Sequence, residues 1–117
     1  MYTNHAVVRH ENDLYILLKR TQSEEDCDVY ELYKYAEPDR QIESAAHREY
    51  RISKVAKRRF APYLYSTMLL LSWAITSGHL SISRSATIGV KRLEKWFAGF
   101  MQEYDDGIID ISTIAAP

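Results

Sequence analysis

The longest stretch without Asp, Glu, Lys or Arg runs from Phe60 to Ser83, in the middle of a chain of 117 residues. Its strongly apolar part, residues 68–75, is apolar on nearly every side when drawn as a helix, which is typical of a helix buried by its neighbours. A membrane-spanning helix needs about 20 predominantly apolar residues, and the rest of this stretch is interrupted by Pro, Gly, Ser and Thr. We therefore expect a central buried helix over residues 63–76 and no membrane span.

Three runs rich in strand-forming residues precede this helix, at residues 6–8, 14–18 and 29–35. The first two are separated by residues 10–13, whose Asn and Asp favour a turn. The second and third are separated by a polar, acidic segment that we interpret as a loop. We expect a three-stranded antiparallel meander within residues 5–36, although the third run could be helical instead.

Residues 38–60 and 84–104 each show an apolar side and a basic side when spaced at 100° per residue. Pro38 suits the first position of a helix, and residues 105–107 would end the last one. Residues 108–114 could form a strand that joins the sheet. The predicted fold class is α+β, a small antiparallel sheet packed on a three-helix core. We expect one domain with a β-rich part (5–36), a helical part (38–104) and an acidic tail or strand (105–117).

The charges are segregated along the chain. Residues 1–39 carry 4 Lys or Arg against 9 Asp or Glu, residues 40–104 carry 11 against 4, and residues 105–117 carry none against 3. The net charge of −1 gives no reason to expect nucleic acid. Its distribution indicates a basic helical surface for an acidic partner, unless the acidic ends fold back on the basic middle.

The candidate partner-binding residues are basic side chains on the two amphipathic helices together with two tyrosines of the third strand. Tyrosine offers a large contact area at low entropic cost, although packing on the helices would equally explain these aromatics. The candidates are Arg48, Arg51, Lys54, Lys57, Arg58, Arg84, Lys91, Arg92, Lys95, Tyr33 and Tyr35.

Residues 82–94 resemble the recognition helix of a bacterial regulator, with Ser and Arg near its start and Lys-Arg-Leu-Glu near its end. This resemblance implies a helix-turn-helix-like element around residues 69–96 and a nucleic-acid-binding regulator as the alternative function. The segment between Gly78 and Arg84 is longer than the usual turn of that motif.

Catalytic and metal-binding patterns are weak. No two of the four histidines have the i, i+4 spacing of a helical metal site, and the acids around Cys27 would raise the pKa of a thiol. One cysteine cannot form an internal disulfide, which favours a reducing cytoplasm. We predict no cofactor, no metal and no enzymatic activity. The expected function is a small interaction protein of the inhibitor, immunity or accessory-subunit type, with an acidic protein or nucleoprotein as its partner.

Overall fold

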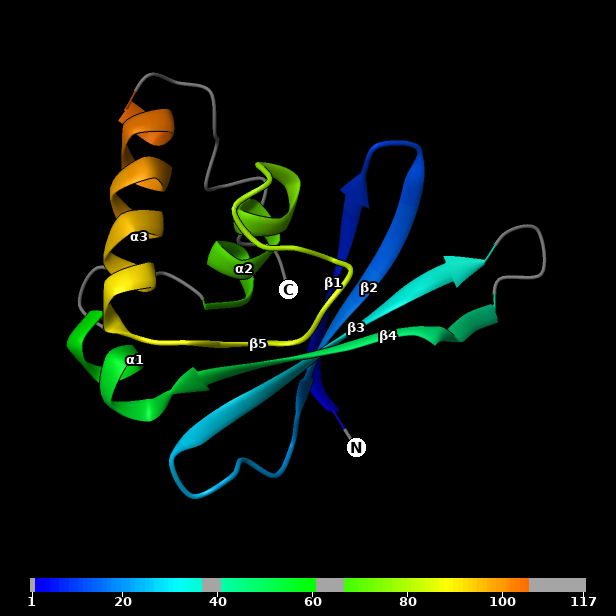
Figure 1. Cartoon of the computed structure of the whole chain (residues 1–117), viewed down its shortest axis with the longest axis horizontal. Coiled ribbons are helices and arrows are strands. Elements are labelled where there is room, and N and C mark those ends of the chain that lie inside the picture. Colours follow the sequence, from blue (N-terminus) through cyan, green and yellow to red (C-terminus); the bar gives the residue numbers. More distant parts are fainter. Residues whose placement is uncertain (1, 37–40, 61–66, 106–117) are drawn as a thin grey trace.

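The chain forms a five-stranded sheet with its helices gathered on one face (Figure 1). The computed structural model describes the backbone of residues 2–36, 41–60 and 67–105, and the side chains of residues 5–35, 47–58 and 67–103. The strand order follows the chain, and all neighbours are antiparallel except the last pair, which is parallel. The predicted α+β class is confirmed. The strands are β1 (Tyr2–His10), β2 (Asp13–Arg20), β3 (Cys27–Ala36), β4 (Gln41–Ser53) and β5 (Ala86–Ile88), and the helices are α1 (Lys54–Phe60), α2 (Thr67–Thr76) and α3 (Val90–Asp105).

The predicted meander is present as β1, β2 and β3. Glu11 adopts a left-handed conformation (φ 56°) in the two-residue turn between β1 and β2. Alternate side chains point toward the helices, and Tyr15, Leu17 and Leu32 are buried on that face. The third run is therefore a strand, and the alternative that it is helical is wrong.

The predicted helix over residues 38–60 is wrong for most of its length, because Gln41–Ser53 is a strand and only Lys54–Phe60 is helical. Tyr50 and Ile52 are both fully buried, whereas Glu49 and Arg51, which alternate with them, are partly exposed. This two-residue period is that of a strand. The predicted face of basic side chains on one helix therefore does not exist.

The central helix is confirmed as α2, and residues 63–66 of its predicted span lie outside the described residues. It is buried along its length, as its lack of charge predicts. Gly78 follows it with a φ of 80°, as expected of a glycine that ends a helix. Among the described helices, none is both long and apolar enough to cross a membrane.

The last predicted helix begins at Val90 rather than at Arg84, because residues 86–88 form β5 beside β4. Ile88 is fully buried there, opposite Ile52. The connection between α2 and α3 thus contains a strand, so the predicted helix-turn-helix arrangement and its recognition helix are wrong. The apolar side of α3 is confirmed, and the possible strand over residues 108–114 lies outside the described residues.

Candidate functional site

Two of the predicted binding cations are paired within the molecule. Arg51 donates from Nε to both carboxylate oxygens of Glu24 at 3.1 Å, and its Nη1 lies 2.9 Å from Oε2 of Glu49. The hydrogen bond from Arg51 lowers the pKa of Glu24. The Nζ of Lys57 forms a close ion pair with Asp28. The acidic N-terminal third therefore folds back on part of the basic middle.

The other predicted cations of β4 and α1 are placed differently. Arg48 is half-buried and pairs in register with Leu32 on the helix-covered face of the sheet. Its Nη1 donates to the carbonyl of His47 at 2.6 Å, and its Nε is buried with no hydrogen-bond partner among the described residues. Lys54 is half-buried and Arg58 is exposed. These side chains do not form one continuous surface.

The face of the sheet that carries no helix holds an ion-pair network that the sequence did not indicate. Glu31 and Glu49 are directly opposite each other on β3 and β4. The Nη2 of Arg20 lies 3.2 Å from Glu31 and 2.9 Å from Glu49. His47 places its Nε2 3.0 Å from Glu31 and stacks on Tyr33 with 4.7 Å between ring centroids. Tyr33 and His47 each lie one residue beyond the Leu32–Arg48 pair, so they occupy facing positions on the two strands at the point where the register becomes irregular.

Glu31, His47 and Glu49 also bring potential metal-ligand atoms within 4.8 Å of one another. Arg20 contacts both carboxylates, and Arg51 contacts Glu49. The negative charge that would hold a cation is thus already balanced by two guanidinium groups. We interpret the cluster as a network that ties β2, β3 and β4 together.

The two candidate tyrosines are both half-buried. The hydroxyl of Tyr33 donates to Glu31 at 3.4 Å, so this residue belongs to the ion-pair network. Tyr35 lies near the end of β3, opposite Leu14. The tyrosines and the remaining cations are therefore on separate parts of the molecule, and a role in partner binding stays a prediction for both.

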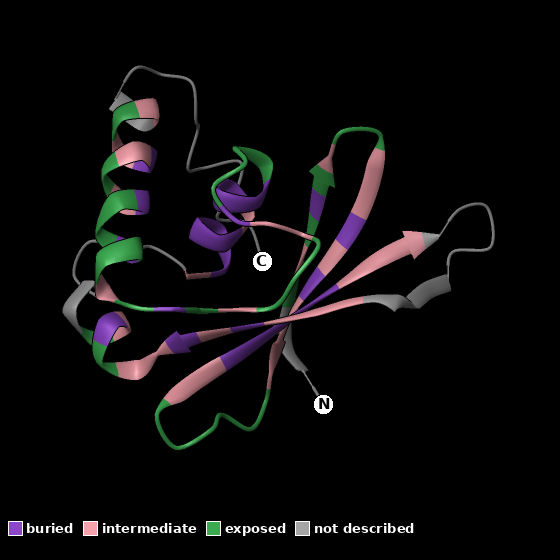
Figure 2. Ribbon diagram, viewed as in Figure 1, coloured by how far each residue is buried: buried purple, intermediate pink, exposed green. Residues whose placement is uncertain are grey.

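Four predicted cations remain grouped, and we call them the α3 cationic surface. Arg84 precedes β5, and Lys91, Arg92 and Lys95 lie on the first two turns of α3. All four are exposed and none makes an ion pair within the described part of the chain. Figure 2 shows the exposed side of α3 turned away from α2 and the sheet.

A pocket of about 570 Å³ opens beside this surface, and both Arg84 and Arg92 line it. The turn after β1 contributes His10, and the segment after α2 contributes His79 and Ser81. No Asp or Glu is among its described lining residues. The pocket therefore combines two arginines with histidine and serine side chains, and the sequence could not reveal it because its walls come from three separate segments.

The wall that carries Arg84 is fixed by hydrogen bonds on both sides. The hydroxyl of Tyr50 donates to the carbonyl of Ser81 at 2.8 Å, and the backbone N–H of Ser83 donates to Oγ of Ser81 at 3.1 Å. The backbone N–H of Glu49 donates to Oγ of Ser85 at 3.0 Å. Burial raises the pKa of Tyr50 to about 12, although nearby Arg48 lowers it, so the phenol stays a hydrogen-bond donor at neutral pH.

Arg92 and His79 are positioned by aromatic rings. The guanidinium of Arg92 lies over the ring of Trp96, with its Cζ 5.2 Å from the ring centroid, a cation–π arrangement. His79 packs on Trp73 with 4.8 Å between centroids, and its Nδ1 lies 2.9 Å from Oγ of Ser77. These contacts restrict both side chains before any ligand arrives.

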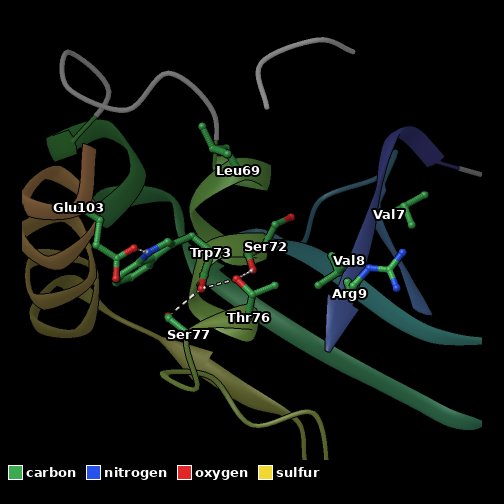
Figure 3. A pocket seen from close by; sticks show the side chains of 9 residues that line it. All are labelled: Val7, Val8, Arg9, Leu69, Ser72, Trp73, Thr76, Ser77 and Glu103. Atoms are coloured by element: carbon green, nitrogen blue, oxygen red, sulfur yellow. Dashed lines mark hydrogen bonds between the residues drawn. The ribbon is translucent and has the colours of Figure 1, made fainter. Parts of the chain in front are cut away.

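A second pocket, of about 440 Å³, lies between the edge strand β1 and α2 (Figure 3). Val7 and Val8 line one side, and Ser72 and Thr76 line the other. Ser72 and Thr76 both donate to carbonyls of their own helix. The lining contains one cation, Arg9, and the acid Glu103. It therefore lacks the one-sided charge of the pocket beside the α3 cationic surface.

The comparisons with known proteins add no assignment. No protein-family model matches this chain, and no curated protein or solved structure matches it significantly.

Proposed function

We propose that this protein is a small non-catalytic interaction protein that docks the α3 cationic surface on an acidic protein partner. The observation that carries the proposal is the contrast between two groups of cations. Arg51 and Lys57 are matched by acids of the same chain, whereas Arg84, Lys91, Arg92 and Lys95 are exposed without an ion pair in the described residues.

The position of these cations in α3 supports a binding role. The first turn of a helix carries the positive end of its dipole, so cations there are unfavourable by about 0.3–1 kcal/mol each. Lys91 and Arg92 lie in that first turn, and no acidic residue accompanies them there. Helix stability therefore does not explain them, whereas attraction of a negatively charged partner does.

A protein partner is favoured over nucleic acid because the helix-turn-helix element is not formed. The start of α3 is preceded directly by β5 and Gly89. No second helix is thus placed by a short turn to position α3 in a groove. The net charge of −1 also provides no overall positive charge for binding along a nucleic-acid backbone. A nucleic-acid-binding regulator remains the alternative function.

Zero-length cross-linking tests this proposal directly. A carbodiimide joins lysine amines only to carboxylates in contact, so in host lysate treated with nuclease we expect Lys91 and Lys95 to be joined to Asp- or Glu-rich peptides of one protein. The double variant Lys91→Glu/Lys95→Glu should lose that protein because like charges then face each other.

The control is Arg9→Glu, which reverses one exposed charge on β1, outside the α3 cationic surface. It should retain the partner, and all variants should keep the far-ultraviolet circular dichroism of the parent. Partner capture unchanged by the double variant would overturn the proposal. A gel shift of random duplex DNA at low salt, abolished by the same variant, would replace the docking function with the regulator function.

We propose that the protein docks its partner in a reducing cytoplasm, because the chain's one cysteine, Cys27, cannot form an internal disulfide.

A further inference from the structure

We infer that the pocket lined by His10, His79, Ser81, Arg84 and Arg92 binds a phosphate monoester. This inference deepens the proposed function. It rests on that function for the identity of the ligand, which we take to be a phosphorylated side chain of the acidic partner. The pocket's own chemistry is independent of that partner and can be tested with small anions.

The charge of the pocket suits a dianion. Arg84 and Arg92 are always protonated, and no described acidic side chain lines the pocket to balance them. Guanidinium groups bind phosphate oxygens through paired N–H donors. A phosphate monoester carries close to two negative charges at neutral pH, whereas a carboxylate would leave one of the two cations unmatched. The positive end of the α3 dipole adds to the same potential.

Part of the site is ordered in advance, which lowers the entropy lost on binding. Arg84 lies between Ser83 and Ser85. The backbone N–H of Ser83 and the side-chain hydroxyl of Ser85 are both held by hydrogen bonds. Arg92 is oriented by the face of Trp96. A flexible surface cation pays this ordering cost only when the ligand binds, so Arg92, and Arg84 on its hydrogen-bonded backbone segment, are better placed for a specific site than Lys91 or Lys95.

The size of the pocket favours an ester over free phosphate. Its volume of about 570 Å³ falls within the range of about 300–1,000 Å³ that is usual for small-molecule sites. Such a volume leaves room for the group that carries the phosphate. Leu80, Ile82 and Ala86 also line the pocket and offer apolar surface to that group.

Titration of ¹⁵N-labelled protein with phenyl phosphate tests the site, with inorganic phosphate and phenylacetate as the second and third arms. We expect saturable shifts of the amides of His79, Ser81 and Arg84 with both phosphates, tighter binding of phenyl phosphate, and little response to phenylacetate. Arg84→Gln and Arg92→Gln should each weaken phenyl phosphate binding about tenfold, since each removes a charge-assisted contact. Lys95→Gln is the matched control, because it removes the same charge from α3 outside the pocket lining.

Each outcome decides the inference. Equal affinity for phenylacetate, or an affinity lowered as much by Lys95→Gln as by Arg84→Gln, would show only a general positive potential and overturn the site. Absence of saturable shifts with either phosphate would also overturn it, while the cross-linking result could still support docking. Saturable phenyl phosphate binding by a protein that captures no partner would keep the site and reject the docking function.

Discussion

Single ion pairs decide which cations of this chain are free to bind. Burial alone would raise the pKa of Asp28, but the hydrogen bond and charge of Lys57 outweigh burial and lower it. Burial would likewise lower the pKa of Lys57, yet Asp28 and Tyr30 together raise it. A lowered carboxyl pKa stabilises the folded state above about pH 4 and loses this effect as the pH falls through the folded-state value.

Replacing Lys57 tests this pair. Lys57→Met should lower the free energy of unfolding at pH 7 by about 1–3 kcal/mol, because Asp28 is left partly buried without its cation. The variant should also lose less stability than the parent between pH 5 and pH 3, since its Asp28 no longer has a lowered pKa. Urea unfolding across that pH range measures both effects. Arg58→Met, which removes an exposed cation from the same helix, is the control and should change stability by less than about 0.5 kcal/mol.

α3 packs closely against α2 at Gly99. A Cβ added to Gly99 would lie 3.0 Å from Cη2 of Trp73, whose indole Nε1 donates to Glu103 at 2.6 Å. Because that hydrogen bond and burial restrict the ring, we expect Gly99→Ala to destabilise the fold by about 1–3 kcal/mol. This loss should exceed the gain in helix propensity, which is at most about 1 kcal/mol.

Gly89 provides the matched comparison, because a Cβ built there meets nothing within 4 Å. Gly89→Ala should be neutral or stabilise the protein by up to about 1 kcal/mol. Thermal unfolding of the two variants, with tryptophan fluorescence to report on Trp73, separates the cases. Equal stability of Gly99→Ala and the parent would show that α2 and α3 can move apart at little cost.

The elements that could be predicted from sequence are those with a clear composition or period. The meander follows from its strand-forming runs, α2 from its uniformly apolar stretch and the apolar side of α3 from its helical spacing. The sequence predicts a helix over β4 because the small residues of this segment fit either period, whereas the two large apolar residues that decide its structure, Tyr50 and Ile52, are spaced by two. The network around Arg20 and Glu31 could not be foreseen, since it depends on the register of three strands. The sequence identifies Arg84 and Arg92 as candidate binding cations. It does not predict the pocket that they share, because that pocket depends on β5, which lies between them in the chain.

At the scale of the whole molecule, the charges serve two separate purposes. On the helix-free face of the sheet, Arg20 and Arg51 are balanced by Glu24, Glu31 and Glu49. The more exposed pair, Arg51–Glu24, contributes about 0–1 kcal/mol, and the pair at the buried Glu31 is screened little by salt, so the network leaves the fold weakly dependent on salt. The α3 cationic surface makes no ion pair with the described residues, and its field extends into the solvent until it is screened.

Salt should therefore separate binding from folding. Between about 0.05 M and about 0.5 M NaCl the screening length falls severalfold, so a fluorescein-labelled oligoglutamate peptide should bind at least about tenfold more weakly at the higher concentration. The midpoint of thermal unfolding should move by only a few degrees, because stability comes mainly from the core around Leu17, Leu70 and Trp96. Fluorescence anisotropy measures peptide binding, and differential scanning calorimetry measures the midpoint of thermal unfolding.

The variants Lys91→Glu/Lys95→Glu and Arg9→Glu provide the control. The double variant should remove the salt-dependent part of binding and Arg9→Glu should retain it, since only the double variant reverses charges on α3. A salt response that is the same in both variants would mean that the overall charge of the molecule attracts the peptide and that α3 has no special role in this attraction.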